Sequence, residues 1–239
     1  MKLISRQKIK KQYERWDLTV KRYHNYVVEG IVVHNSNARV GFSMLPDRDE
    51  HSVLEWKAGS HKVKRKMPNE EDLSTNTYWY PFTLAPVKNL LVSLAEDANI
   101  NRATLFGEVY GKIRGGHKSM SYGRLNSLNY VAFSLKINGN YVDWAIFNRY
   151  CERFGVRTVP VIDVCSFNMG LMKLMASGPS LLAQENGADH MREGIVIVAA
   201  TERKEFDTDR AILKMLNPDY LLLKNKKEAK GETVDFKDE

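Results

Sequence analysis

The sequence predicts an α+β protein in which a short all-β segment precedes a larger domain of mixed antiparallel sheets and helices. Residues 12–33 alternate in polarity and are rich in Val, Thr and Tyr, which is typical of short strands. Helix-like and strand-like segments then follow without a βαβ rhythm, which argues against a doubly wound sheet. With 239 residues, 43% of them apolar, the chain can bury one substantial core. We therefore expect a leader at 1–35, a body at 36–223 and a charged, frayed tail at 224–239.

The elements of the body are expected in this order. Residues 43–82 are polar and contain three prolines, which favours loops. A helix is expected over 86–101, because Pro86 stands near its start and leucines recur at helical spacing. Asn138-Gly139 is typical of a tight hairpin turn. The other helices are expected at 144–154 and 169–176, and the strands at 104–110, 129–137, 141–143, 159–164, 194–200 and 211–216.

Charge is concentrated in the leader. Its first 35 residues hold eight Lys and Arg against three acids, so the leader carries +5 and the other residues only +2 of the net +7. A basic leader favours an acidic partner through electrostatic steering, although a solvated basic tail explains the charge as well.

Composition also indicates the compartment. Two cysteines give neither a disulfide framework nor a metal-ligand spacing, which favours a reducing cytoplasm. We expect no membrane association, because no apolar run approaches the roughly 20 residues of a membrane span. The basic start also lacks the apolar stretch of a secretory signal.

The peptide bond between Asn35 and Ser36 has the neighbours that a specific cleavage needs. The Asn35 side-chain amide can attack its own backbone carbonyl and close a succinimide, which breaks the bond. His34 titrates in the range needed to polarise that carbonyl and protonate the leaving amine. The Ser36 hydroxyl can hold an acyl group as an ester before the break.

The residues before this bond resemble the C-terminal part of inteins. Trp16-Asp17-Leu18-Thr19-Val20 with His24-Asn25-Tyr26 is similar to the penultimate intein block, and Gly30-Ile31-Val32-Val33-His34-Asn35 to the last one. The resemblance implies that Asn35 cyclises with the help of His34 and that Ser36 accepts the acyl chain. It implies that Asp17 and His24 support the last steps, although His24 also suits a structural role in a strand.

The leader carries no N-terminal intein nucleophile and no Thr-x-x-His block. This implies the C-terminal half of a split intein, whose partner is an N-terminal fragment carrying the other intein half. A gene truncated at this point is the alternative.

Five short blocks of the body, in this order, resemble nick-sealing ATP-dependent RNA ligases over nearly all of residues 36–223. The first is similar to the end of the family's lysine motif, Lys-x-His/Asp-Gly-Ser/Thr-Asn. The blocks are Ser36-Asn37-Ala38-Arg39-Val40-Gly41-Phe42, Leu105-Phe106-Gly107-Glu108-Val109-Tyr110-Gly111, Tyr130-Val131-Ala132-Phe133-Ser134-Leu135, Arg192-Glu193-Gly194-Ile195-Val196-Ile197 and Ala211-Ile212-Leu213-Lys214-Met215-Leu216-Asn217-Pro218-Asp219-Tyr220. This resemblance implies a ligase adenylation (nucleotidyltransferase) domain in which a lysine holds AMP, with ATP and Mg²⁺ or Mn²⁺ as cofactors.

The resemblance also implies roles for single residues. Glu108, flanked by glycines, would bond a ribose hydroxyl, and Phe133 would stack on adenine; a strand-end acid and a core aromatic are the alternatives. Glu193 would bind the metal, or merely mark the start of a strand. Lys214 is costly to bury in an apolar strand without a phosphate partner, although a lysine can also protect an edge strand.

Two further residues are expected near the nucleotide or the RNA end. Arg65 lies in a basic run after a Gly-Ser stretch, which could equally be a solvated loop. Asn37 would stand five residues after the lysine of the family motif.

The chain departs from the family pattern at three places. The nucleophilic lysine, four residues before Ser36, is missing; Leu216 stands where the family has a second lysine, and Ser134 replaces an aspartate. We expect a precursor that splices in trans and then joins the 3′-OH and 5′-phosphate ends of nicked or broken RNA, in a cytoplasm that could be that of a phage host. A nucleotide- or RNA-end-binding module without ligase activity, or a DNA ligase-like nucleotidyltransferase, are the alternatives.

Overall fold

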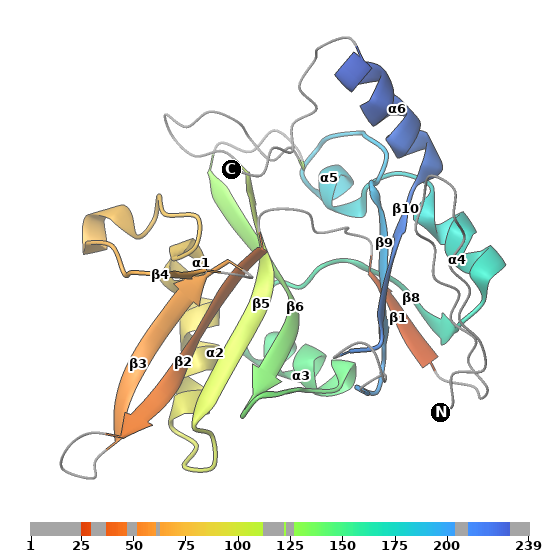
Figure 1. Ribbon diagram of the computed structural model, residues 1–239. Coiled ribbons are helices and arrows are strands. Elements are labelled where there is room, and N and C mark those ends of the chain that lie inside the picture. The colour runs from red at the N-terminus through yellow and green to blue at the C-terminus, as the bar shows by residue number, and fades with distance from the viewer. Residues whose placement is uncertain are drawn as a thin grey trace.

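Two antiparallel sheets stand side by side with helices packed against them (Figure 1). The structure is a computed structural model that describes residues 25–29, 37–46, 52–60, 63–111, 122, 127–203 and 210–229. The mixture of antiparallel sheets and helices confirms the predicted α+β class. Strands predicted at 12–24 and 30–33 lie outside the described residues.

The larger sheet has six strands in the order β4-β3-β2-β5-β6-β7. Strands β5 and β6 are joined to their neighbours by long antiparallel ladders, and β6 turns into β7 at Asn138-Gly139 with positive φ at both residues (48° and 89°). This is the hairpin that the sequence predicts. The strands are β2 (Asn37–Pro46), β3 (Ser52–Gly59), β4 (Lys64–Arg65), β5 (Arg102–Gly111), β6 (Leu128–Ile137) and β7 (Asn140–Tyr141).

The smaller sheet has four strands in the order β10-β9-β1-β8. They are β1 (Asn25–Glu29), β8 (Val161–Ser166), β9 (Gly194–Ala199) and β10 (Ile212–Leu216). Strand β1 belongs to the predicted leader, yet both of its neighbours, β8 and β9, belong to the body. Residues 25–29 therefore complete a sheet of the body.

Helix α2 covers one side of the larger sheet, and helix α4 covers one side of the smaller sheet. In the six-stranded sheet this helix side holds the largest core, where Val40, Leu105 and Leu135 meet Leu90 and Leu91 of α2. Helix α4 covers the four-stranded sheet through Met172 and Ala176. The helices are the 3₁₀ turn η1 (Glu70–Asp72), α1 (Tyr80–Thr83), α2 (Ala85–Ala95), α3 (Trp144–Phe154), α4 (Met169–Ala176), α5 (Leu181–Glu185) and α6 (Pro218–Ala229).

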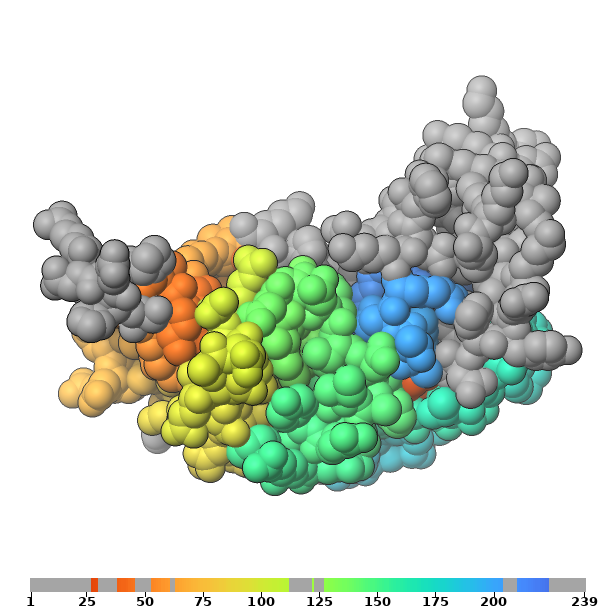
Figure 2. Space-filling view, turned by 90° about the horizontal axis from the view of Figure 1, so that it is seen from below, coloured from red at the N-terminus to blue at the C-terminus, as the bar shows by residue number. Residues whose placement is uncertain are grey.

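The two sheets are joined near β7. The Trp144 backbone N–H donates to the Ala200 carbonyl over 3.1 Å, and the Glu202 N–H donates to the Asp143 carboxylate over 2.7 Å. The Arg210 guanidinium lies 4.3 Å from the ring centroid of Tyr141. Seen from below, the segment around β7 and α3 meets the segment that follows β9 (Figure 2). This contact holds the second sheet against the first.

Some sequence predictions are wrong. The segment 43–82, expected to be loops, holds all of β3 and β4 and the end of β2. In β3, Trp56 and Ala58 alternate with Glu55 and Lys57, and only Trp56 and Ala58 reach the core. The helix expected over 86–101 ends at Ala95. The frayed tail expected from 224 is helical as far as Ala229, in a helix whose start is capped by the Asn217 side chain.

The two cysteines lie in different surroundings. Cys151 is buried in the core of the larger sheet, where burial raises the pKa of its thiol to about 12. Cys165 is half-buried on β8, directly opposite Tyr26 of β1. None of the helices in the described part of the chain is long and apolar enough to cross a bilayer.

Candidate functional site

Glu108 lies near the end of β5, on the side of the six-stranded sheet opposite the main core. Its Cα partners across the sheet are Asn37 on β2 and Val131 on β6. The glutamate is buried, with 1% of its surface exposed. The predicted strand position between two glycines is confirmed, and the alternative of an exposed strand-end acid is wrong. We call this side of the sheet the Glu108 side.

Gly107 explains why a glycine precedes Glu108. A Cβ atom at this position would lie 2.3 Å from the ring of Tyr130, so only a glycine lets that ring pack against the strand. Tyr130 belongs to the core on the helix side. Because side chains alternate along a strand, Glu108 then points to the opposite side.

Phe133 sits in a β-bulge of β6. Phe106 pairs with Ser134 and Gly107 pairs with Ala132, which leaves Phe133 as the extra residue between them. A bulge changes the direction of a side chain and is common beside binding sites. The Phe133 ring is partly buried and packs against a cluster on the Glu108 side that contains Tyr110, Tyr122, Val131, Val159 and Leu182.

The Tyr122 hydroxyl lies within electrostatic reach of a carboxylate from each sheet region. Burial raises the pKa of its hydroxyl well above the usual value, and the nearby carboxylates of Glu108 and Glu193 and the Tyr220 hydroxyl raise it further. Glu108 and Glu193 therefore lie within electrostatic reach of one hydroxyl, although they are 85 residues apart in the sequence. Sequence reasoning missed Tyr122, which stands alone in a region without hydrophobic periodicity.

Glu193 immediately precedes β9, as predicted. Hydrogen bonds fix its own carbonyl and the carbonyl of the preceding residue, Arg192. The Glu193 carbonyl accepts the Asn217 N–H over 2.8 Å, while the Asn217 side chain donates to the Arg192 carbonyl over 3.0 Å. The buried Arg192 guanidinium donates to the carbonyls of Pro179 and Met175 over 3.1 and 3.2 Å. These bonds anchor the chain at the start of β9 and so position the Glu193 side chain.

Lys214 lies in the middle of β10, which is an edge strand of the smaller sheet. Its Cα partner is Val196, and the Cα partner of Val196 on the next strand is Glu29. These three residues form a row across the sheet, on the side opposite α4. The expectation of a buried lysine is wrong: Lys214 is exposed, because β10 has a neighbour on one edge only.

Glu29 is a buried acid that sequence reasoning did not single out. Only 4% of its surface is exposed, and burial raises the pKa of its carboxyl to about 8, against a smaller lowering by Arg210 and with a contribution from Glu202. Its burial follows from the central position of β1, which the sequence alone does not reveal.

Arg65 lies on the other side of the larger sheet. It pairs with Ala58, whose side chain belongs to the helix-side core, and its guanidinium lies 5.0 Å from the ring centroid of Tyr78. The structure therefore does not bring Arg65 together with Glu108. Lys57 and Lys64, two lysines near Arg65 in the sequence, pair with Gly41 and Gly59 and lie on the Glu108 side.

Five of the predicted residues lie outside the described residues, and their roles stay predictions. They are the residues expected to act in splicing: Asp17, His24, His34, Asn35 and Ser36. Asn37 is described as part of β2 and is the second residue after the predicted junction.

The RNA ligase family model matches residues 33–216, which is more than half of the chain. The chain belongs to the RNA ligase family. The match includes Glu108, Phe133, Glu193 and Lys214. Among curated proteins, none matches the chain significantly.

Three solved structures are similar in fold to this RNA ligase family member. Two are forms 1 and 2 of an archaeal ATP-dependent RNA ligase, each 14% identical with a TM-score of 0.46, and each match covers 82% of this chain and 44% of that one. The third is a putative ATP-dependent DNA ligase from Aquifex aeolicus, 17% identical with a TM-score of 0.47, covering 87% of this chain and 48% of that one. The chain spans less than half the length of each of these ligases.

A divalent metal is implied by the RNA ligase family. Among the described residues, no group of three or more His, Cys, Asp and Glu side chains could hold a metal ion. Mg²⁺ is usually held by one or two carboxylates together with phosphate oxygens and water, rather than by a full protein cage. Glu193 fits such a site, with bound nucleotide phosphates supplying the other ligands.

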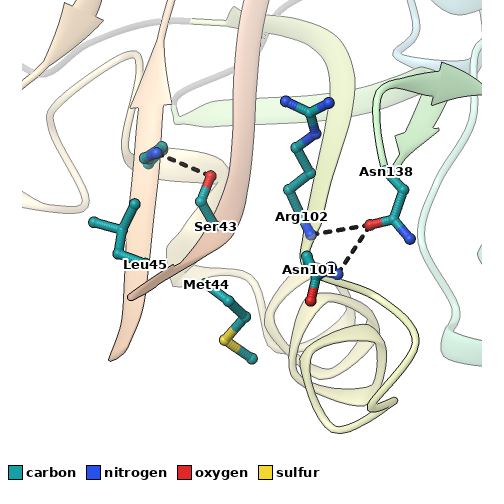
Figure 3. Close-up of a pocket in the computed structure, with 7 residues that line it drawn as sticks. Ser43, Met44, Leu45, Asn101, Arg102 and Asn138 are labelled. Atoms are coloured by element: carbon teal, nitrogen blue, oxygen red, sulfur yellow. Dashed lines mark hydrogen bonds between the residues drawn. The ribbon is translucent and has the colours of Figure 1, made fainter. Parts of the chain in front are cut away.

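One cavity of about 580 Å³ lies elsewhere in this RNA ligase domain, between the end of β2 and the start of β5 (Figure 3). Its lining includes Lys57 and Arg102, and the Lys57 ammonium donates to the Ser43 hydroxyl over 2.9 Å. Arg102 is six residues before Glu108 on β5, which corresponds to roughly 20 Å along a strand. The cavity is therefore distinct from the residues around Tyr122.

Proposed function

We propose that the body of this protein is the larger part of an ATP-dependent RNA ligase domain that transfers AMP and seals RNA ends. One observation carries the proposal: Glu108 on β5 and Glu193 at the start of β9 lie within electrostatic reach of the same buried hydroxyl, that of Tyr122, whose cluster packs against the partly exposed ring of Phe133. Two acids, an aromatic ring and the exposed Lys214 are the groups that a nucleotide with its metal requires.

Each group has a distinct role in this proposal. The Phe133 ring stacks on the adenine, and the Glu108 carboxylate accepts a hydrogen bond from a ribose hydroxyl. The Lys214 ammonium neutralises phosphate charge from the edge of the smaller sheet. Glu193 binds the divalent cation, which when bound offsets the charge of the phosphates during transfer.

The chain lacks the nucleophile for this chemistry at the expected position. The family motif places a lysine four residues before the serine or threonine, and Val32 stands at that place. A valine side chain has no amine that could attack the α-phosphate of ATP. The reactive lysine must therefore come from another segment.

We propose that protein splicing in trans supplies that segment. The upstream fragment carries the lysine part of the motif followed by an acidic intein half. Its acyl group at the end of the lysine part is first transferred to the Ser36 hydroxyl; the bond between this acyl group and the intein half breaks, and the departing intein half takes up the hydroxyl proton. The Asn35 side-chain nitrogen then attacks the Asn35 carbonyl carbon, the peptide bond to Ser36 breaks, and His34 protonates the leaving amine. The acyl group finally moves from the Ser36 oxygen to the freed nitrogen, which forms an ordinary peptide bond.

The spliced product then carries out three transfers. The lysine amine attacks the α-phosphate of ATP and releases pyrophosphate, leaving AMP on the enzyme. The 5′-phosphate of an RNA end takes over the AMP, and the neighbouring 3′-OH attacks that phosphate and releases AMP.

The test is to incubate the purified chain with ATP labelled at the α-phosphate, alone and after reaction with the upstream fragment. We expect no covalent label on the chain alone, and both label and sealing of nicked RNA after splicing. Asn35→Ala is the matched control, because it stops release of the leader without changing any residue of the nucleotide site. Label on the unspliced chain would overturn the role of the upstream lysine.

A module that binds nucleotide or RNA ends without sealing them is the second candidate. Ser134 favours it, because this residue is buried beside Phe133, where the family has an aspartate. Leu216 favours it as well, since it ends β10 without the family's second lysine. A spliced product that binds ATP but seals neither nicked RNA nor nicked DNA would support this candidate, and sealing of DNA alone would indicate a DNA ligase.

A further inference from the structure

Strand β1 is an internal strand of the smaller sheet. It is hydrogen-bonded to β8 along one edge and to β9 along the other. Both Val27 and Val28 are completely buried. Val28 faces the core formed with Met172, Ile195 and Ile197, so this short segment is part of the packing of the body.

The proposed cleavage site lies between the two sheets in the sequence. Strand β1 ends at Glu29 and β2 begins at Asn37, and these strands belong to different sheets. A break after Asn35 therefore removes an internal strand from the smaller sheet and leaves the larger sheet complete. Without a substitute, the edges of β8 and β9 would lose their backbone partners and the core beneath would lose Val28, which is costly.

We propose that β1 occupies its position in the sheet only until the leader is released. The position between β8 and β9, which we call the slot, is then the binding site for an extended segment of the upstream fragment, which replaces β1. This inference rests on the proposed trans-splicing. The slot selects the incoming segment by its shape: it buries two successive residues on opposite sides, so it takes consecutive apolar residues of about the size of valine. Main-chain hydrogen bonds to both neighbours supply the affinity, as in other cases of strand addition.

The exchange couples splicing to folding of the ligase. While β1 lies in the slot, its backbone groups are bonded to the body and are not available to pair with an upstream intein half. The leader must leave the slot before or while the splicing site assembles. The segment that enters the slot belongs to the same fragment that brings the lysine.

A disulfide between β1 and β9 tests this coupling. Val27 and Val198 are Cα partners, so Val27→Cys with Val198→Cys can be bridged without moving the strands, in a Cys165→Ser background that removes the nearby thiol. We expect the oxidised protein, mixed with the upstream fragment, to lose release of the leader. Reduction with dithiothreitol restores it.

A second cysteine pair serves as the control. Leu45 and Val53 are Cα partners on β2 and β3, and both are exposed. A disulfide between Leu45→Cys and Val53→Cys in the same background fixes two strands that do not separate, so its oxidation leaves leader release unchanged. Equal release from the oxidised and reduced forms of the β1–β9 variant would overturn the exchange. No release from the parent or the reduced variant would refute the splicing proposal, and the exchange with it.

Hydrogen exchange of the purified spliced product tests the second half of the inference. The amides of β8 and β9 that face the slot keep their protection if the upstream segment has replaced β1. Rapid exchange at both edges in the spliced product would mean that the slot is empty and that no replacement occurs.

Discussion

Asn37 of β2 lies directly opposite Glu108 of β5. Asn37 is the second residue after the proposed splice junction, and Glu108 is the proposed ribose ligand. The proposed acyl acceptor, Ser36, is therefore the sequence neighbour of Asn37, which pairs with a residue of the proposed nucleotide site. If the proposed splicing takes place, an upstream segment would be joined to the chain two residues before the start of the pairing between Asn37 and Glu108.

Replacing Glu108 tests its place in the nucleotide site. Glu108→Gln keeps the shape of the buried side chain but removes the charge of the acceptor. Hydrogen bonds to charged groups contribute about 1.5–3 kcal/mol, so AMP transfer to the spliced product should fall about ten- to a hundredfold. The label on the protein after incubation with ATP measures the effect. Glu55→Gln, on the same side of the sheet but engaged with Lys57 and Lys64, is the control, and equal losses in both variants would refute a special role for Glu108.

Replacing Phe133 tests stacking on the base. Phe133→Leu keeps an apolar side chain in the bulge but removes the flat ring. Since stacking on an aromatic ring contributes about 1–3 kcal/mol per base, we expect a KM for ATP roughly tenfold higher in the spliced product. Phe154→Leu, which changes a ring packed against the helix-side core, should leave the KM unchanged. An unchanged KM in Phe133→Leu would place the adenine elsewhere.

Gly107 is expected to tolerate no side chain. Gly107→Ala brings a Cβ atom within 2.3 Å of the Tyr130 ring, which is fully enclosed by its neighbours. The crowding should lower the free energy of unfolding by about 1–3 kcal/mol, measured by urea denaturation. In the control Gly170→Ala the nearest atom is 3.3 Å away, at the end of the Asn168 side chain, and stability should change little. Equal free energies of unfolding for the two variants would show that the Tyr130 ring can move away from the new methyl group without loss of stability.

Glu29 should make stability depend on pH. Its pKa is about 8 in the folded protein and 4.5 ordinarily, so between these values the unfolded chain has released a proton that the folded chain still holds. Stability therefore falls as the pH rises through this window, and the loss reaches roughly 3 kcal/mol near pH 7. Glu29→Gln should remove this dependence, as measured by melting temperatures from pH 5 to pH 9. If the melting temperatures of the parent and the variant change in parallel with pH, the pKa of the Glu29 carboxyl is not raised in the folded protein.

Sequence patterns predicted the elements that carry their own start and stop signals. Helix α3 has its predicted bounds, and Gly155 ends it in the left-handed conformation at φ 71°. Helix α4 also has its predicted bounds, and the Asn168 side chain caps it. Strand β3 was missed because its polar half faces away from the core, so its composition resembles that of a loop.

The site was predictable only in part. The positions of Glu108 and Glu193 follow from short motifs whose glycines are required by close packing: a Cβ on Gly194 would lie 2.1 Å from the Met215 carbonyl oxygen. The approach of both acids to Tyr122 depends on how two sheets meet, which no local pattern encodes. The side of the sheet on which Arg65 lies depends on the pairing of β3 with β4, and the sequence does not specify that register.

The two thiols of the protein offer a probe of strand exchange that needs no mutation. Cys151 is enclosed and holds its proton to high pH, whereas Cys165 is half-buried on the strand that borders β1. A maleimide fluorophore should therefore modify Cys165 first, at the rim of the slot. A change in the emission of the fluorophore would report the replacement of β1 by the incoming strand as it happens, in a chain without substitutions.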